Sequence, residues 1–395
     1  MKFILVGISD TSNYVPTNEV GDLISGNYYF SGGKRHYERV KHLLPLSHEW
    51  LNITIPLAEV LSSYQSLDGS VVVFVSGDPF FYGFGTTLKR EFPYASFENY
   101  PYFNSLQMHA HRLNLPYEEM MCVSCTGRPW DRLNEALIRN EGIIGVLTDR
   151  KKRPEVIAQY LLDSGYDNYD ISVGENLGGD SERLITLTLN DCIHQEFAPL
   201  NNIILHRKAD RSFPIGVSND QYRYLDGRPN MMTKPIYRLH TISLMQMHAK
   251  KVFWDVGFCT GSVSIEAKRL YPKLKVVAFE KRLVSEEIIK DNMKRFGAPG
   301  IEYVIGDFLN QDIDDYARPD AVFIGGHGGK LAEILDRIDS ILPVGGIIAT
   351  NAVKEESASI FIQTLLDKDY QIEEKSHIQL DTFNPVSVIV MMKQK

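Results

Sequence analysis

Cysteine is scarce in this sequence. Four of the 395 residues are cysteines, at positions 122, 125, 192 and 259. So few cysteines exclude a disulfide framework in a chain of this length, and we expect a cytoplasmic protein. Cys122 and Cys125 form a Cys-x-x-Cys pair, but no second pair of Cys or His stands at the spacing of a zinc site. We therefore expect no metal.

Long hydrophobic runs and an excess of positive charge are also missing. The first apolar run, Phe3 to Val6, ends at Gly7 and is too short for a signal-peptide core or a membrane span. It indicates a first buried strand. The formal net charge is -8, so no cationic field attracts nucleic acid or an anionic membrane. We expect neither as a partner.

The length and the apolar content favour two domains. A chain of 395 residues with 44% hydrophobic residues can bury a sizeable core but is too long for one ordinary domain. Between Arg207 and Pro235 the sequence is polar, rich in Pro and Gly, and without clear periodicity. We place the boundary there and predict domains at 1–210 and 211–395.

Short β-rich runs alternate with helical patterns, which is typical of α/β folds with mostly parallel sheets. The predicted strands are 3–6, 71–75, 143–147, 169–173, 184–189, 202–206, 252–256, 275–279, 302–305, 320–324, 346–350 and 386–392. Helices are predicted at 131–140, 154–164 and 263–270, among others. The sequence therefore predicts an α/β protein throughout.

The strongest local signal follows the strand at 252–256. Asp255 and Gly257 end that strand, and the turn through Phe258, Cys259, Thr260 and Gly261 leads into a helix. Such a loop lets the backbone approach a ligand closely. The next strand ends in Glu280, where an acid accepts hydrogen bonds from ribose hydroxyls, and Asp307 follows the third strand. This pattern indicates a nucleoside site, with a purely structural tight turn as the alternative.

From Thr233 and Lys234 onward the sequence resembles the precorrin-6B/precorrin-8w decarboxylating methyltransferases. The shared motifs are the loop from Asp255 to Ser262, the stretch from Asn292 to Gly297 and the strand end from Phe323 to Gly326. The resemblance implies a class I Rossmann-like methyltransferase domain that binds S-adenosylmethionine. Its cofactor contacts would be Thr233, the residues from Gly257 to Gly261, Glu280 and Asp307.

The first half carries a separate signal after the strand at 71–75. Gly77 permits a sharp turn after Ser76, Asp78 can fix backbone donors or a bound ligand, and Pro79 is expected to open the next helix. This turn, with the segments 32–36 and 173–179, resembles the tetrapyrrole (corrin/porphyrin) methylases. The resemblance implies a tetrapyrrole methylase-type α/β domain, in which Ser76, Gly77, Asp78 and Phe81 are candidate contacts to a second S-adenosylmethionine.

The order of the two halves resembles the fused precorrin-6Y C5,15-methyltransferases (decarboxylating) of cobalamin biosynthesis. That resemblance implies methylation of a precorrin-type tetrapyrrole at carbons 5 and 15 and decarboxylation of the ring C acetate. Carboxylate arms of such a substrate would be bound by cationic side chains; the candidates are Lys34, Arg35, Arg128, Lys234 and Arg238. We expect a homo-oligomer and assign no catalytic side chain.

Two alternative hypotheses differ from this one in the number of catalytically active domains. In a partly degenerate fusion only the C-terminal domain would be active. A non-enzymatic tetrapyrrole-binding protein would use neither. A class I methyltransferase of RNA or protein amides is disfavoured, because the Asn/Asp-Pro-Pro-Tyr/Phe tetrad is absent and the strand end reads Ile324-Gly325-Gly326-His327.

Overall fold

The computed structural model describes residues 1–9, 11, 14–228, 231–381 and 384–395. These residues form two compact units. Unit 1 comprises Met1–Arg128, Gly142–Gln159 and Tyr169–Lys208, and unit 2 comprises Pro129–Glu141, Tyr160–Asn168 and Ala209–Lys395. The division into domains at residue 210 stays a prediction.

Unit 1 contains a five-stranded sheet in which every strand runs parallel to its neighbours. Its order is β3 (Glu49–Asn52), β2 (Tyr29–Gly32), β4 (Ser70–Ser76), β1 (Lys2–Ile8) and β5 (Ser96–Tyr100). The central strands β1 and β4 are continuous apolar runs because they are buried on both faces. Ile4, Val6 and Val72 pack on one face, while Phe3 and Leu5 pack on the other.

The second sheet of unit 1 is mixed, which corrects the expectation of mostly parallel strands there. Its order is β6 (Met121–Ser124), β7 (Ile143–Leu147), β10 (Asn201–Arg207), β8 (Tyr169–Glu175) and β9 (Arg183–Thr188). Only β6 and β7 pair in parallel. The short connection from β8 to β9 permits only an antiparallel pair, and β10 runs antiparallel to both β7 and β8.

Unit 2 is built on a seven-stranded sheet. Its order is β13 (Ile301–Ile305), β12 (Lys275–Glu280), β11 (Val252–Val256), β14 (Ala321–Ile324), β15 (Ile347–Ala352), β17 (Val386–Lys393) and β16 (Tyr370–Ile378). The first five strands are parallel, and β17 is antiparallel to both of its neighbours. The order reverses between β11 and β14, which is where α/β sheets open a crevice at the carboxyl ends of their strands.

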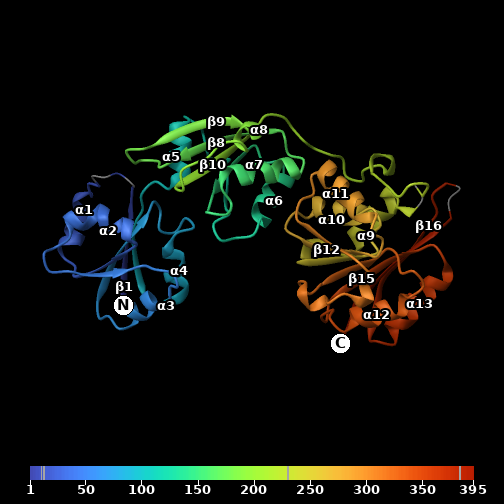
Figure 1. Cartoon of the computed structure of the whole chain (residues 1–395). Helices are drawn as coiled ribbons and strands as arrows, with labels where there is room; N and C mark the ends of the chain where they lie inside the picture. Colours follow the sequence, from blue (N-terminus) through green and yellow to red (C-terminus); the bar gives the residue numbers. More distant parts are fainter. Residues whose placement is uncertain (10, 12–13, 229–230, 382–383) are drawn as a thin grey trace. The chain divides into compact units, whose positions relative to one another are not determined.

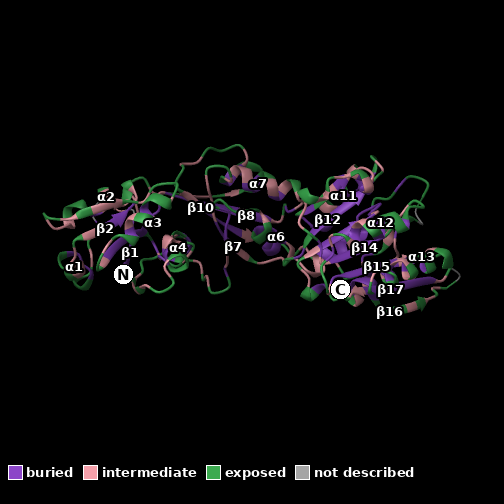
Figure 2. Ribbon diagram, turned by 90° about the horizontal axis from the view of Figure 1, so that it is seen from below, coloured by how far each residue is buried: buried purple, intermediate pink, exposed green. Residues whose placement is uncertain are grey.

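Helices cover both faces of the sheet in unit 2. Figure 1 shows α9 (Pro235–Leu244), α10 (Ser262–Leu270) and α11 (Ser285–Phe296) on one side, with α12 (Leu331–Asp339) and α13 (Glu355–Leu366) on the other. Two apolar cores fill the layers between the helices and the strands. The central strands β14 and β15 are accordingly buried in Figure 2, whereas the helices carry exposed residues on their outer side.

The remaining helices lie in the first 192 residues or are short 3-10 turns. They are α1 (Asn18–Ser25), α2 (Lys34–Val40), η1 (Lys41–Leu43), α3 (Ala58–Gln65), α4 (Phe84–Glu91), α5 (Ser105–Arg112), α6 (Asp131–Ile138), α7 (Pro154–Asp163), α8 (Leu189–Cys192), η2 (Asn219–Gln221), η4 (Met247–Ala249), η5 (Phe308–Asn310) and η6 (Ile313–Asp315). Each of the twelve predicted strands has a counterpart in the structure, so the predicted α/β class is confirmed.

Candidate functional site

The loop between β11 and α10 is held close to the end of β14. Gly257 has φ +79° and a Cβ added there would lie 2.3 Å from the carbonyl oxygen of Gly326. Gly261 has φ +75° and faces Ile289 at a similarly short distance. Both positions therefore require glycine, because a side chain would meet neighbouring atoms and the backbone is left-handed.

Glu280 ties this loop to the end of β12. Its carboxylate accepts a hydrogen bond from the backbone N–H of Cys259 at 3.0 Å. It also accepts bonds from the backbone and the guanidinium of Arg282, at 3.1 and 3.0 Å. The side chain is 3% exposed and faces a crevice of about 200 Å³. In nucleoside-binding sheets, an acid at the end of the second strand accepts hydrogen bonds from the ribose hydroxyls.

The crevice brings together three of the residues predicted for the cofactor: Gly257, Glu280 and Asp307. Asp307 accepts a hydrogen bond from the Leu309 N–H at 3.1 Å and pairs with Lys330 at 3.2 Å. These contacts, the backbone bond first, hold the pKa of Asp307 below its usual value. Asp307 is therefore an anion at neutral pH in the wall of this crevice.

Four predicted cofactor residues lie behind the crevice wall. Phe258 is 4% exposed and packs in the core with the helices α10 and α11, so its ring leaves the crevice open. Cys259 packs against Leu225 and Ile288, and burial raises the pKa of its thiol to about 11. The Thr260 hydroxyl is buried and finds no hydrogen-bond partner among the described residues. Gly261 begins the helix as its N-cap.

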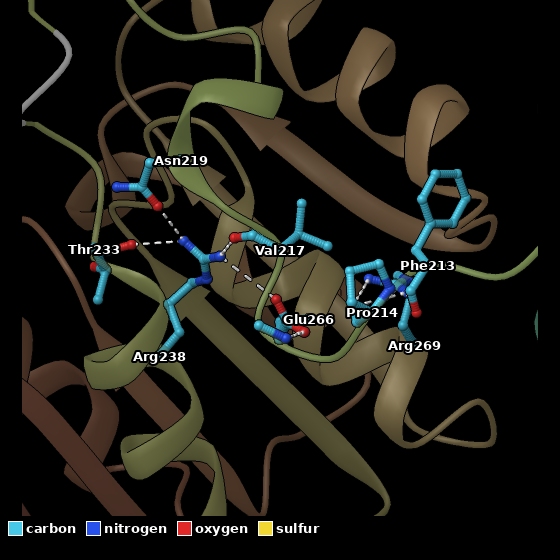
Figure 3. Close-up of polar contacts among 9 residues, drawn as sticks. Phe213, Pro214, Val217, Asn219, Thr233, Arg238, Glu266 and Arg269 are labelled. Carbon is cyan, nitrogen blue, oxygen red and sulfur yellow. Dashed lines mark hydrogen bonds and ion pairs between the residues drawn. The ribbon is translucent and has the colours of Figure 1, made fainter.

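The structure corrects the prediction for Arg238. Its side chain is 0% exposed, and Figure 3 shows its guanidinium surrounded by residues of the same unit. It donates hydrogen bonds to the side chain of Asn219 and the carbonyl of Thr233, both at 2.7 Å, and to the carbonyl of Val217. It also forms an ion pair with Glu266 at 3.5 Å. These contacts make Arg238 a core residue that is inaccessible to a substrate.

Thr233 and Lys234 stand just before α9. The Thr233 carbonyl is one of the acceptors of Arg238, and Lys234 is the N-cap residue of the helix. Burial lowers the pKa of Lys234, while Asp381 raises it. Neither residue belongs to the wall of the crevice at Glu280.

Several residues of the crevice were missed by sequence reasoning. Lys281, Arg282, His327 and Lys330 all contribute to its wall. The sequence offered one signal, since His327 directly follows two glycines at the end of a predicted strand. Burial lowers the pKa of His327, and the Lys354 charge lowers it further.

Asp255 is a further residue whose role the sequence did not reveal. It lies at the end of β11, is 1% exposed, and accepts hydrogen bonds from the N–H and the hydroxyl of Ser264, at 3.1 and 2.6 Å. Burial raises its pKa to about 7, against the opposing effect of the two Ser264 bonds. Asp255 thus fastens the first turn of α10 to the strand that precedes the glycine loop.

A second cavity, of about 400 Å³, lies within unit 1. Its wall includes the end of β4, the start of α2, the start of α5 and the beginning of β10. At its edge Gly77 has φ +64°, and a Cβ there would lie 2.9 Å from the Cα of Asn104. Glycine therefore allows the turn after β4 to pack against the start of α5.

This cavity brings together Ser76, Gly77, Phe81 and Arg35 of the predicted residues. Asp78 is outside its wall and stabilises the turn by accepting a hydrogen bond from the Phe80 N–H at 2.8 Å. Lys34 is exposed at the start of α2 and is also outside the wall.

Arg128 lies beside the same cavity. Its guanidinium donates a hydrogen bond to Ser124 at 2.9 Å and stands 5.2 Å from the ring centre of Tyr82, which is part of the wall. His36 is a residue of the wall that sequence reasoning missed, although it follows the predicted Lys34 and Arg35.

Two kinds of feature are absent from the described residues. None of their helices has the length and apolar character needed to cross a membrane. Over the same residues, no three or more His, Cys, Asp and Glu side chains are gathered as they would be around a metal ion.

Two protein families match the chain, one in each half. Residues 38–192 match the tetrapyrrole (corrin/porphyrin) methylases, and residues 225–390 match the precorrin methyltransferase domain. The fold and these matches define the class of the protein as a methyltransferase with two methyltransferase domains.

Individual relatives narrow this class. A precorrin-6Y C(5,15)-methyltransferase [decarboxylating] from Sinorhizobium sp is 29% identical over 364 residues, covering 91% of this chain and 86% of the relative. A cobalt-precorrin-6B C(15)-methyltransferase (decarboxylating) from Salmonella typhimurium is 32% identical, and the match covers 34% of this chain and 68% of the relative. A cobalt-precorrin-7 C(5)-methyltransferase from the same organism is 25% identical, covering 46% and 87%. The chain belongs to the family of the precorrin-6Y C5,15-methyltransferases (decarboxylating).

Proposed function

We propose that this enzyme uses S-adenosylmethionine to methylate a precorrin-6 type corrinoid at carbons 5 and 15 and to decarboxylate the ring C acetate, as a step of cobalamin biosynthesis. The methylation at carbon 5 is assigned to residues 1–210. The decarboxylating methylation at carbon 15 is assigned to residues 211–395. The observation that carries this proposal is the glycine-walled crevice closed by Glu280, in a chain whose two halves match two different methyltransferase families.

The residues of the crevice fit a bound S-adenosylmethionine. Glu280 would accept hydrogen bonds from the ribose hydroxyls, as an acid at the end of the second strand does in nucleoside-binding sheets. Gly257 and Gly326 both belong to the crevice wall, where the lack of side chains would let a ligand approach the backbone. Asp307 would accept a hydrogen bond from the adenine amino group. Thr233 and the loop residues Phe258, Cys259, Thr260 and Gly261 would support this site from behind.

In methyl transfer, the main task of the protein is to position the cofactor and the substrate. When bound, S-adenosylmethionine supplies an electrophilic methyl group, so no side chain has to activate it. The chain's contribution is to hold the nucleophilic ring carbon in line with that methyl group and to exclude water. Glu280 and the glycine loop fix the position of the cofactor, and no metal ion is needed for either step.

The cavity of unit 1 would hold the second cofactor. Gly77 and Phe81 belong to its wall, and Asp78 shapes the turn that carries them. Ser76 is also in the wall.

A corrinoid substrate carries many carboxylate arms, which cationic side chains would bind. We propose Arg35 and Arg128 for this role at the cavity of unit 1, because one belongs to its wall and the other stacks on Tyr82 in that wall. Lys34 stands next to Arg35 at the start of α2. Lys234, at the start of α9, is the corresponding proposal in unit 2.

Incubation of the purified chain with S-adenosylmethionine and a precorrin-6 pool tests the proposal. We expect a product that has gained two methyl groups and lost one carbon dioxide, read from its mass. A chain that transfers no methyl group to this pool would refute it. A product with one methyl group and no loss of carbon dioxide would refute the assignment of decarboxylation to residues 211–395.

A further inference from the structure

One wall of the cavity in unit 1 carries a cluster of three polar side chains. Arg35 and His36 lie in the first turn of α2, and Ser76 is the last residue of β4. All three belong to the wall of the cavity. Arg35 and His36 both approach the hydroxyl oxygen of Ser76, at 2.8 and 3.0 Å.

The hydrogen bonds around His36 settle which of its nitrogens carries a proton. The backbone N–H of Gly33 donates to Nδ1 at 3.1 Å, so Nδ1 has no proton of its own. Burial lowers the pKa of His36 to about 4, with a further effect of the Arg35 charge, so the ring is neutral. Its one proton is therefore on Nε2, and Nε2–H donates to Ser76.

Ser76 consequently receives two hydrogen bonds and has its own hydrogen left to give. A hydroxyl offers one hydrogen and two acceptor positions, and here the donors Arg35 and His36 use both acceptor positions. The side chain is exposed to the cavity. Two donors on the oxygen also polarise the O–H bond, which makes the hydroxyl a stronger donor.

We propose that the Ser76 hydroxyl donates to a carboxylate arm of the tetrapyrrole substrate, and that Arg35, His36 and Ser76 together form a carboxylate subsite. This inference rests on the proposed function. It assigns Ser76 to the binding of the substrate, whereas the sequence suggested a contact to the cofactor. A carboxylate only accepts hydrogen bonds, so it suits a hydroxyl donor beside a guanidinium. The methionine end of the cofactor also has a carboxylate, but its neighbouring ammonium would be repelled by Arg35. An acetate or propionate arm has no such charge.

Substitution S76A in the full chain tests the subsite. With the precorrin-6 pool, product masses separate the methylation without loss of carbon dioxide from the decarboxylating one. For the methylation without loss of carbon dioxide, we expect the KM of the tetrapyrrole to rise about tenfold, because one hydrogen bond to a charged group is lost. The kcat and the KM of S-adenosylmethionine should stay unchanged, as should the decarboxylating reaction. Substitution S76T keeps the hydroxyl and should restore the KM.

Control and binding measurements make the result decisive. Substitution S63A removes a hydroxyl on α3 that is outside the cavity wall and should change nothing. Binding of uroporphyrin III, an inert macrocycle with eight carboxylates, needs no turnover, and S76A should weaken it about tenfold at one site.

An unchanged affinity for uroporphyrin III and an unchanged KM for the tetrapyrrole would overturn the subsite. A rise in the KM of S-adenosylmethionine alone would assign the carboxylate to the cofactor and overturn it too. A wild-type chain without methyl transfer would refute the proposed function, while uroporphyrin binding would still decide on the subsite.

Discussion

Gly257 and Gly326 are in contact through their backbones, and Gly257 has no space for a side chain on the side that faces Gly326. A Cβ on Gly257 would lie 2.3 Å from the Gly326 carbonyl oxygen and 2.6 Å from its nitrogen. Gly257 begins the loop after β11, and Gly326 follows β14, so this contact joins the two strands at which the sheet order reverses. The proposed cofactor crevice depends on it.

Substitution G257A should therefore damage both stability and cofactor binding. Its backbone is left-handed and the added methyl group would clash with backbone atoms, so we expect a loss of more than about 2 kcal/mol in the free energy of unfolding. Binding of S-adenosylhomocysteine at the C-terminal site should be lost, as measured by calorimetry. Gly345 is the matched control, because it has φ +76° and no atom near its added Cβ. G345A should cost about 1 kcal/mol and leave binding intact. Equal effects of the two substitutions would contradict the clash.

Substitution E280Q tests the ribose contact. The amide oxygen can still accept the Cys259 N–H, so the fold should survive. The negative charge is lost and an amide group faces Arg282, so we expect binding of S-adenosylhomocysteine at the C-terminal site to weaken about 10- to 100-fold. Glu287 on α11 is mostly exposed and pairs with Arg223. The control E287Q should leave the affinity unchanged, and an E280Q protein with wild-type affinity would remove Glu280 from the site.

The sequence was sufficient for the strands that contain long apolar runs. β4 has a continuous apolar run and β11 is apolar apart from Asp255, and their predicted limits agree with the structure to within one residue. The strands β3 and β16 were missed because they are edge strands, with partly exposed residues such as Glu49 and Glu374 and no apolar run. A short polar edge strand is specified mainly by the neighbour with which it pairs, and that neighbour is distant in the sequence.

The candidate site was predictable only where it depends on neighbouring residues. The glycine loop and Glu280 follow from local spacing, and the structure places them together at one crevice. Arg238 could not be predicted, because its burial depends on Asn219 and Glu266, which the fold brings to it from two other segments. His327 enters the crevice through the same kind of long-range packing. Arg282, by contrast, lies there because it follows Glu280 by two residues and donates to its carboxylate.

Asp255 should make stability depend on pH. Burial raises its pKa from 3.8 to about 7, so the folded protein holds this proton more tightly than the unfolded chain does. As the pH rises from about 4 to about 7, the unfolded chain loses the proton first and the contribution of Asp255 to the free energy of unfolding falls. D255N cannot titrate, so its stability relative to the wild type should rise over this range and stay constant above it.

Urea unfolding of both proteins between pH 4 and 8 measures this difference. D220N, which replaces an exposed aspartate, controls for the general loss of a carboxylate. Parallel stability curves for the wild type and D255N would show that Asp255 keeps an ordinary pKa in the folded protein.

Substitution of Arg238 distinguishes clearly between a structural role and a role in substrate binding. Substitution R238M removes the partner of Glu266, whose side chain is 1% exposed, and leaves an uncompensated buried carboxylate. We expect the free energy of unfolding to fall by about 3–5 kcal/mol, measured by urea denaturation. The double substitution R238M/E266Q removes that charge as well and should recover a large part of the loss, because the amide oxygen can still accept the Gly216 N–H. If R238M instead kept its stability and raised the KM of the tetrapyrrole, Arg238 would have to reach the substrate, and the buried position described above would be wrong.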